Sequence, residues 1–381
     1  MQPRSSRHGG EWRWLLRRTR FRGAGDNWRL LREKATILRR ATPAKLANAA
    51  ALKLQKRLGR MRLRGMPYRY KIDPTNRCSL RCPLCPTGRR IGGRPRGTMD
   101  LDLYRRLLSE IAPWAVTLDL FGWGEPLLHP RITTMISLAA SHGIYTRLST
   151  SLNTEDPSLP AALVASGLDA IIVGLDGATE ETYRRYRRGG DLWTVTDNIR
   201  RLAAARQRTG RATPLLIARM LVHSGNEHDI AATRRLARRL GADVFTVSPV
   251  FLDPADRPLA ERWRPLNRRL DAYAGGAFNR GQCSDLWESL VINWDGGVSP
   301  CCWIHRRDRD LGDCRTATIR ELWNGPAFVA ARAAVLGRAT GDPAPHIYCR
   351  QCRGRPDYLA DIPAGTRASQ AGAAAAATGS A

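Results

Sequence analysis

Three cysteines in one short segment are the residues of this 381-residue chain best suited to chemistry. Cys78, Cys82 and Cys85 follow a C-x3-C-x2-C spacing. Thiolates are soft ligands, and three of them so close together suit zinc or an iron–sulfur cluster. Structural zinc sites usually close with a fourth protein ligand, and no fourth cysteine or histidine lies nearby. Three thiolates on a four-iron cube would leave one iron open to a non-protein ligand.

This spacing resembles the signature of the radical S-adenosylmethionine (SAM) superfamily. The resemblance implies that Cys78, Cys82 and Cys85 hold a [4Fe–4S] cluster whose open iron chelates the methionyl group of SAM. In that family an electron from the cluster cleaves SAM to a 5′-deoxyadenosyl radical, which abstracts hydrogen from an unactivated C–H bond. A flavodoxin- or ferredoxin-type electron donor is therefore an expected partner. A chance loop of three cysteines, or a degenerate zinc knuckle, is the alternative.

Gly124, Glu125 and Pro126 resemble a second feature of the superfamily, the "GGEP" motif. The resemblance implies that they hold the amino group of SAM, and closely spaced glycines do let the backbone approach a ligand. Trp123 occupies the first position of the usual glycine pair. A plain turn before a helix at 130–142 is the alternative.

Four further residues are candidates for contacts with SAM or substrate. Leu84 stands where the family commonly has an aromatic residue near the adenine, and Ser149 resembles its polar contacts to ribose or carboxylate. If Arg219 lines the barrel it needs an anionic partner, and the SAM carboxylate suits its bidentate geometry; if it faces outward it pairs with a helix carboxylate. Asp176 either binds substrate or removes a proton, or it is only a turn residue after its strand.

A second group of cysteines lies near the C-terminal end of the chain, at Cys283, Cys301, Cys349 and Cys352. With Gly296 and the segment 311–328, this group resembles the SPASM/twitch extension of radical SAM enzymes. The resemblance implies one auxiliary [4Fe–4S] cluster ligated by these four thiolates. Cys302 could replace Cys301, although the Gly-x4-Cys spacing favours Cys301. A zinc ribbon built on the same thiolates is the alternative.

Short apolar runs alternate with longer amphipathic stretches from residue 68 onward. The runs predict strands near 68–73, 116–121, 144–149, 169–175, 214–222 and 243–249. The stretches predict helices near 100–112, 130–142, 157–167, 179–187, 192–208 and 226–240. Strands alternating with helices indicate parallel βα units. Six units are too few to close an eight-stranded barrel, so an open (β/α)6 arrangement is expected.

The candidate residues follow the ends of successive strands, where parallel βα barrels place their active sites. The cysteine loop follows the first strand and Gly122–Pro126 the second, while Ser149, Asp176 and His223 come at the ends of the next three. The predicted fold class is therefore α/β: a partial (β/α)6 TIM-like barrel with a small C-terminal cluster-binding α+β domain and a basic helical N-terminal extension.

Composition divides the chain into five predicted segments: an extension at 1–66, the barrel at 67–255, a linker at 256–282, the auxiliary cluster domain at 283–361 and a disordered tail at 362–381. Residues 1–25 are also expected to be disordered. The extension predicts two helices with narrow apolar stripes, beginning after Asp26-Asn27 and at Thr42-Pro43, that pack on the main domain. Val291 to Val298 predicts a hairpin turning at Asp295-Gly296.

Composition also indicates the cellular compartment of the protein and the kinds of partner it could bind. The chain is 43% hydrophobic and lacks an apolar run long enough to span a membrane, and its cysteines are clustered. We therefore expect a cytoplasmic protein with metal ligation rather than a disulfide framework. The net charge is +28, and residues 1–66 carry 19 Lys and Arg against 3 acidic residues. Such a charge attracts nucleic acid, acidic lipid or a phosphorylated substrate, or it only reflects a GC-rich genome that encodes many arginines.

The motifs together predict a radical SAM oxidoreductase whose auxiliary cluster assists a net oxidation. A small molecule such as a sugar, cyclitol or nucleoside is the favoured substrate, because the extension lacks the strands of the leader-binding domain common in peptide-modifying relatives. A ribosomal peptide or protein is the alternative. Acidic lipid or a membrane surface remains open as a partner of residues 1–66. A non-catalytic, zinc-stapled nucleic-acid-binding protein would explain the charge but not the residues at the strand ends, so nucleic acid is not expected.

Overall fold

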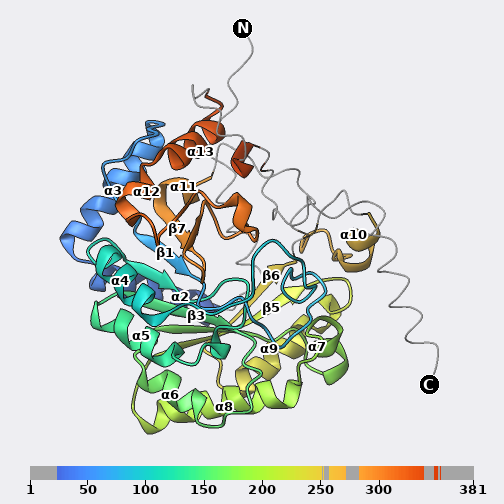
Figure 1. Ribbon diagram of the computed structural model, residues 1–381. Coiled ribbons are helices and arrows are strands. Elements are labelled where there is room, and N and C mark those ends of the chain that lie inside the picture. Colours follow the sequence, from blue (N-terminus) through green and yellow to red (C-terminus); the bar gives the residue numbers. More distant parts are fainter. Residues whose placement is uncertain are drawn as a thin grey trace.

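Six parallel strands joined by helices form the centre of the molecule (Figure 1). A computed structural model describes residues 24–250, 252, 257–271, 283–338, 347–350 and 352. The strands are β1 (Arg69–Ile72), β2 (Thr117–Asp119), β3 (Tyr145–Thr150), β4 (Ala170–Gly174), β5 (Leu215–Val222) and β6 (Val244–Pro249). The connecting helices are α4 (Leu101–Ile111), α5 (Ile132–Ser141), α6 (Leu159–Ala165), α7 (Glu180–Tyr186), α8 (Leu192–Arg208) and α9 (Ile230–Arg239). Neighbouring strands pair in chain order, so the predicted open (β/α)6 arrangement is confirmed.

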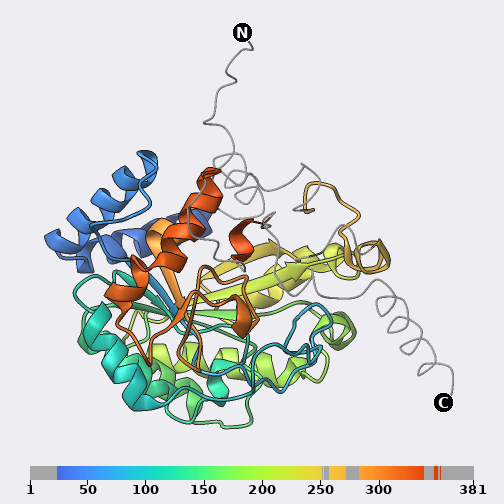
Figure 2. The same ribbon diagram turned by 45° about the horizontal axis from the view of Figure 1, so that its top comes forward.

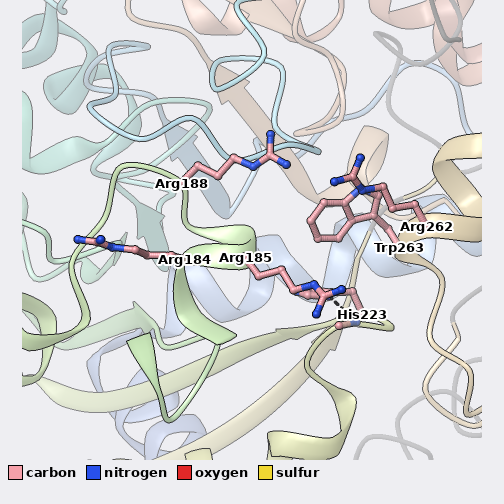
Figure 3. Close-up of a pocket in the computed structure, with 7 residues that line it drawn as sticks. Arg184, Arg185, Arg188, His223, Arg262 and Trp263 are labelled. Carbon is pink, nitrogen blue, oxygen red and sulfur yellow. Dashed lines mark hydrogen bonds between the residues drawn. The ribbon is translucent and has the colours of Figure 1, made fainter. Parts of the chain in front are cut away.

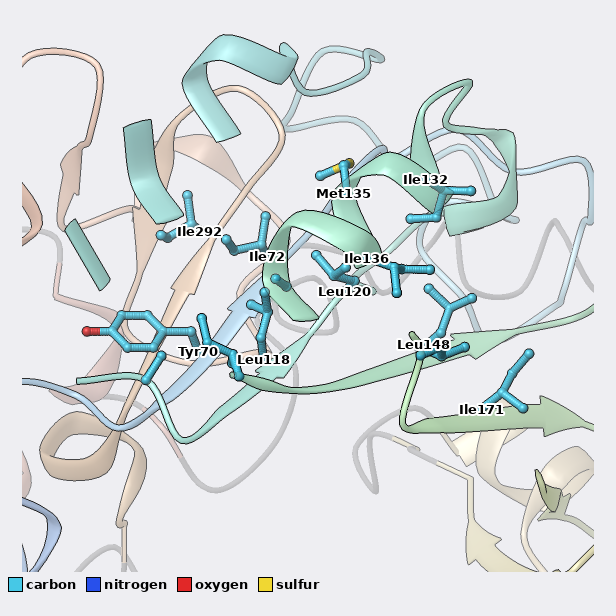
Figure 4. Packing of buried hydrophobic residues seen from close by; sticks show 14 of the residues in the cluster. Tyr70, Ile72, Leu118, Leu120, Ile132, Met135, Ile136, Leu148, Ile171 and Ile292 are labelled. Atoms are coloured by element: carbon cyan, nitrogen blue, oxygen red, sulfur yellow. The ribbon is translucent and has the colours of Figure 1, made fainter. Parts of the chain in front are cut away.

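The hydrophobic core lies between these strands and the helices that cover them. Figure 4 shows the strand residues Leu118, Leu148 and Ile171 near α5, whose Met135 and Ile136 are fully buried. Each side chain of this kind contributes roughly 1.5–3 kcal/mol when it leaves water. Packing on this scale holds the strands side by side, so the loops that leave their carboxyl ends gather at one rim.

Side-chain caps determine where several of the helices begin. Thr179 and Thr182 form a capping box at the start of α7, and the Asp191 carboxylate accepts from the backbone N–H of Thr194 in α8. Asp100 caps α4 in the same way. Each cap contributes about 1 kcal/mol and fixes the residue at which its helix begins.

The sheet continues beyond the barrel into the C-terminal part of the chain. β7 (Ser289–Ile292) pairs in parallel with β1, and β8 (Gly297–Ser299) returns antiparallel to it. β9 (Gly312–Asp313) pairs with β8 and completes a nine-stranded sheet in the described residues. Gly296 adopts φ +82°, the left-handed region that favours glycine, so the predicted hairpin is confirmed. The C-terminal α+β part and the barrel share one sheet.

The second half of the N-terminal extension packs on the C-terminal helices, which are α11 (Asp285–Glu288), α12 (Ile319–Trp323) and α13 (Pro326–Leu336). Figures 1 and 2 both show α3 (Pro43–Arg57) beside this group. The indole Nε1 of Trp323 donates to the Gly65 carbonyl, and that of Trp287 donates to the Arg60 carbonyl, each at 2.9 Å. Residues far apart in the chain are therefore joined by buried hydrogen bonds.

The first helix of the extension, α2 (Ala24–Arg40), lies at the other end of the barrel. Arg40 pairs with Asp169, which directly precedes β4. Arg29 donates to the carbonyl oxygen of Asp243, which directly precedes β6, at 2.7 Å. Both contacts are at the amino-terminal ends of strands, opposite the rim that carries the candidate residues. Part of the basic extension thus has a structural role.

The apolar stripes predicted for the extension do not form its packing surface, and that prediction was wrong. The exposed residues include Trp28, Leu31, Leu38, Leu46, Leu54 and Leu58. The buried residues of α3 are instead Lys45, Asn48 and Leu52. The Asn48 amide bonds both backbone groups of Met66, accepting at 2.9 Å and donating at 2.7 Å. Directed polar contacts therefore dock these helices.

Several predicted segments are only partly described. The predicted linker at 256–282 contains α10 (Arg257–Trp263), whose Trp263 is buried, while residues 272–282 lie outside the described part. The segments 1–23 and 353–381, including the predicted tail, also lie outside it. None of the helices in the described ranges combines the length and apolar composition of a transmembrane segment.

Arg94 joins the segment after the cysteine loop to the C-terminal hairpin. Its buried guanidinium contacts Asp295 at 2.5 Å and both carboxylate oxygens of Asp310 at 2.7 and 2.8 Å. Burial raises the pKa of Asp310 to about 6, although the neighbouring Arg94 acts to lower it. Asp310 therefore depends on this cation to remain charged in the interior.

Replacing Arg94 with methionine should strongly destabilise the fold, because the buried carboxylate of Asp310 would lose its ion-pair partner and Asp295 would keep only Arg307. Breaking a buried ion pair in this way typically costs about 3–5 kcal/mol. Arg105→Met is a matched control, since Arg105 pairs with Asp102 on the exposed surface of α4, where ion pairs contribute little. Denaturant unfolding followed by circular dichroism should show a large shift for R94M and almost none for R105M. Equal shifts would contradict this assignment.

Candidate functional site

The three cysteines of the predicted cluster site lie together in the loop that leaves β1. Cys82 is buried, and Cys78 and Cys85 are partly buried. The backbone N–H of Leu80 donates to Cys78 Sγ at 3.4 Å. Burial raises the pKa of Cys78 to about 12 and that of Cys82 to about 11, and negative charge on neighbouring thiols raises both further. A bound cation would instead lower the pKa of these thiols and favour their thiolate forms. The loop therefore suits a group that carries positive charge.

The loop of Gly122–Pro126 packs directly against the cysteine loop. The backbone N–H of Glu125 donates to the Arg77 carbonyl at 2.7 Å. A Cβ atom added to Gly124 would lie 2.0 Å from the Thr75 carbonyl oxygen, which no side chain could tolerate. The two loops therefore meet only because position 124 is glycine.

The carboxylate of Glu125 is used to hold this loop to the end of β3. It accepts from Thr150 Oγ1 at 2.6 Å, from the Ser151 N–H at 2.8 Å and from Ser151 Oγ at 2.7 Å. Pro126 then begins a 3-10 turn, η1 (Pro126–Leu128). The backbone carbonyls of the loop, rather than the Glu125 side chain, are the groups left for the predicted contact with an ammonium group.

Arg219 and Ser149 come together on one face of the sheet. Arg219 Nη2 donates to Ser149 Oγ at 3.0 Å, and the Arg219 Nε is buried without a hydrogen-bond partner. Burial and the nearby Arg187 both lower the pKa of Arg219. No carboxylate forms an ion pair with Arg219 among the described residues, so the outward-facing alternative is not what the structure shows. An anionic group beside Ser149 would satisfy this guanidinium.

Asp176, the predicted proton acceptor, is fully buried, and its carboxylate already has partners. One oxygen accepts from Arg187 Nε, and the other accepts from the Leu221 N–H at 2.6 Å. Asn226 donates to its backbone carbonyl at 2.9 Å. Asp176 thus anchors Arg187, and its role as a proton acceptor stays a prediction.

Arg187 is a site residue that the sequence did not reveal. Its guanidinium hydrogen-bonds the Cys82 thiol and lowers the pKa that burial raises. Gly174 makes room for it, since a Cβ there would lie 2.3 Å from Arg187 Nη2. Arg187 belongs to a run that includes Arg184, Arg185 and Arg188, and the sequence gives no signal that this arginine alone turns inward.

Asp73 is a second residue that the sequence analysis missed. It follows β1 and is 2% exposed, and its Oδ2 accepts from the Trp123 N–H at 3.2 Å while Oδ1 has no hydrogen-bond partner. Burial raises the pKa of Asp73 to about 7. Gly122 is in close contact, because a Cβ there would lie 2.3 Å from the carboxyl carbon. An unpaired acid on the rim is a candidate for contacts with a bound group.

Leu84 is buried in a small apolar cluster between the cysteine loop and the barrel rim. The cluster includes Leu80, Tyr186, Val250 and Trp263. This packing helps to fix the middle of the cysteine loop, together with the hydrogen bond from the Arg81 N–H to the Arg188 carbonyl at 2.8 Å. The predicted position of Leu84 beside an adenine stays a prediction.

The four cysteines of the predicted auxiliary site come from separate segments of the C-terminal part. Cys283 precedes α11, Cys301 follows β8, and Cys349 and Cys352 lie in and after η5 (Tyr348–Arg350). Burial raises the pKa of Cys349, and charges on Cys283 and Cys352 raise it further. Charge on Cys349 in turn raises the pKa of Cys301. The four thiols therefore share one electrostatic environment.

Cys301 and Cys302 share part of their surroundings, since burial and Asp285 raise the pKa of both thiols. Lys71 of β1 lowers the pKa of Cys302, whereas charge on Cys349 raises that of Cys301. Cys301 as the ligand stays a prediction. Within the described residues, no three His, Cys, Asp or Glu side chains converge in the arrangement that would hold a single metal ion.

Comparison with known proteins identifies the family. A radical SAM superfamily model matches residues 72–237, and a SPASM model, an iron–sulfur cluster-binding domain, matches residues 283–353. A PqqA peptide cyclase of Ruegeria pomeroyi is 32% identical over 298 residues, which are 70% of this chain and 76% of that protein. The chain belongs to the radical SAM superfamily.

Another curated protein and two solved structures are also similar to this chain. A cofactor-modifying protein for tungsten-containing aldehyde ferredoxin oxidoreductase from Pyrococcus furiosus is 27% identical over 296 residues, covering 69% of this chain and 82% of that protein. Streptococcus suis SuiB bound to SAM shares the fold with a TM-score of 0.56 at 14% identity, over 76% of this chain and 73% of that one. The structure of anSMEcpe with SAM and a peptide has a TM-score of 0.51 at 15% identity. The match covers 79% of this chain and 95% of that one.

As a radical SAM protein with a SPASM domain, the chain uses SAM, a [4Fe–4S] cluster and an auxiliary iron–sulfur site. The rim at β1 fits the first two. Three thiols lie in one loop, the glycine at position 124 lets the next loop pack against it, and Arg219 offers an unsatisfied N–H. Cys78, Cys82 and Cys85 would hold the cluster, and Arg219 with Ser149 would face the carboxylate of SAM.

Gly124→Ala should prevent the cysteine loop from closing on its neighbour, because its Cβ would collide with the Thr75 carbonyl. Bound iron should then fall toward the content of a chain that carries only the auxiliary cluster, and SAM binding should be lost. Gly92→Ala is the control, since nothing lies within 4 Å of a Cβ at position 92. Iron analysis and equilibrium dialysis with SAM would test this. Normal iron and SAM binding in G124A would contradict it.

Asp73→Asn should change how stability depends on pH. The pKa of Asp73 is raised from 3.8 to about 7, so between these values the folded chain keeps a proton that the unfolded chain releases. The contribution of Asp73 to stability therefore decreases as the pH rises through this window. The amide of the variant carries no charge, so the Tm of D73N relative to wild type should increase from pH 5 to pH 8. A constant difference in Tm across this range would show that the pKa of Asp73 is not perturbed.

Proposed function

We propose that this radical SAM enzyme modifies a peptide, and that it closes a bond within that peptide by oxidation. The similarity to the PqqA peptide cyclase of Ruegeria pomeroyi supports the proposal, since it extends over 70% of this chain at 32% identity. The sequence analysis favoured a small molecule because the extension lacks a leader-binding domain of the expected kind. The relatives favour the peptide alternative instead.

The residues at the rim would have separate roles in this reaction. When bound, the cluster and SAM supply a 5′-deoxyadenosyl radical that abstracts a hydrogen atom from a C–H bond. Arg219 and Ser149 would orient SAM through its carboxylate, and Gly124 would let the backbone contact its amino group. Arg187, held by Asp176, would steady the thiolate of Cys82 by donating to it. The apolar cluster around Leu84 would exclude water from this side of the loop.

Bond formation within the peptide removes two hydrogen atoms in total. One leaves in the abstraction step, and the second leaves as a proton and an electron. The electron needs an acceptor, and the four thiols of Cys283, Cys301, Cys349 and Cys352 would hold the single auxiliary [4Fe–4S] cluster that takes it. Because all its irons would be ligated by protein, this cluster would not bind the substrate directly.

Co-expression with the short peptides encoded next to its gene is the direct test. Mass spectrometry should find one such peptide lighter by two hydrogen atoms, with fragmentation interrupted between the joined residues. Co-expression with C78A should leave the peptide unchanged, because the cluster that cleaves SAM could not form. An enzyme that cleaves SAM and oxidises a sugar or nucleoside, but leaves every neighbouring peptide intact, would show that the peptide proposal is wrong.

A further inference from the structure

A pocket of about 180 Å³ opens near the end of α7 (Figure 3). Its lining includes Arg184, Arg185, Arg188, His223, Arg262 and Trp263, from α7, the end of β5 and α10. The pocket lies beside the cysteine loop. The carbonyl of Arg188 accepts from the Arg81 N–H at 2.8 Å, and Trp263 belongs to the apolar cluster that contains Leu80 and Leu84.

Three of the four arginines in the pocket have no carboxylate partner in the described part of the chain: Arg185, Arg188 and Arg262. Arg184 differs, because it pairs with Glu180 and with Asp191. Figure 3 shows Arg184 pointing away from the others, whereas Arg185 extends toward His223 and Arg188 toward Trp263. Uncompensated cations held this close repel one another, so an anion in the pocket would be stabilised.

His223 gives independent evidence for a ligand. Its ring is fully buried, and its Nδ1 accepts from the Gly225 N–H at 3.0 Å, which places the proton on Nε2. That Nε2 is buried without a hydrogen-bond partner. The rings of Tyr186 and Trp263 hold the imidazole in place, with centroids 5.6 and 4.8 Å away. The lining therefore offers a fixed N–H donor that lacks an acceptor.

Gly225 positions Arg185 beside this histidine. A Cβ at position 225 would lie 2.6 Å from Arg185 Nε, so the Arg185 side chain packs closely over the Gly225 backbone. The end of α7 also links the pocket to the cysteine loop, since Arg187 lies near Cys82 while Arg185 and Arg188 line the pocket. A group bound here would lie beside the cysteine loop.

We propose that this pocket binds an acidic side chain of the peptide substrate, whose carboxylate accepts from His223 Nε2 and from Arg185 and Arg188. Guanidinium groups bind carboxylates with two parallel hydrogen bonds, which fixes both position and orientation. Sites for whole small molecules usually measure about 300–1,000 Å³. A volume of about 180 Å³ suits one side chain better, with the rest of the peptide lying along the rim. This inference rests on the proposed function.

A fluorescent oligoglutamate peptide and its oligoglutamine counterpart provide a test that does not depend on turnover. The holoenzyme should bind oligoglutamate in fluorescence anisotropy at physiological salt, and bind oligoglutamine far more weakly. R185Q/R188Q should weaken oligoglutamate binding by about tenfold or more, because two charge-assisted contacts are lost. H223F, which keeps a ring but removes the donor, should weaken binding to a smaller extent.

A control variant separates the pocket from general charge attraction. R200Q/R208Q removes two charges from α8, outside the pocket lining. It should bind oligoglutamate as wild type does. Equal weakening in R200Q/R208Q would overturn the proposal, and so would tight binding of inorganic pyrophosphate with none of oligoglutamate. If R185Q/R188Q still binds the peptide product of the co-expression test at wild-type affinity, the proposed function stands and the pocket proposal falls.

Discussion

The pairing of β1 with a parallel strand on each side is the constraint on which the rest of the structure depends. Arg69 of β1 stands opposite Thr117 of β2 on one edge and Ser289 of β7 on the other. The ladder continues past the strand, since the Asp73 N–H donates to the Ile292 carbonyl at 2.9 Å. A shift of one residue would turn the core face of β1 toward the barrel interior. The cysteine loop therefore leaves the sheet at a single defined place.

In the part of the chain that the structure describes, most buried charges around that loop have partners, but two buried N–H groups have no hydrogen-bond acceptor. Asp176 neutralises Arg187, and Glu125 receives hydrogen bonds from the end of β3, so these carboxylates serve to position neighbours. Arg219 Nε and His223 Nε2, in contrast, are buried without partners. Buried polar groups without hydrogen-bond partners are expected at sites where a protein binds a ligand. Both lie on the rim that carries the cysteines, which links the site for SAM to the arginine pocket.

Local patterns were sufficient to predict much of this arrangement. The apolar runs of β1 to β6 and the spacing of Cys78, Cys82 and Cys85 depend on near neighbours in the sequence, and so does the Asp295-Gly296 turn. Long-range contacts were not accessible in the same way. Nothing in a run of arginines indicates that Arg187 alone lies near Cys82. The contacts that bury Asp73 form only when the loop after β2, with Gly122 and Trp123, packs beside β1. The docking of α2 through charged side chains could not be predicted either, because hydrophobic periodicity does not detect polar contacts.

Reductive cleavage of SAM by the anaerobically reconstituted chain tests the central claim most directly. With a chemical reductant, the wild-type chain should carry roughly eight irons and release 5′-deoxyadenosine. The triple variant C78A/C82A/C85A should keep roughly four irons, held by the auxiliary cysteines, and release none. Stoichiometric zinc in the wild-type chain, with no cleavage of SAM, would contradict the account.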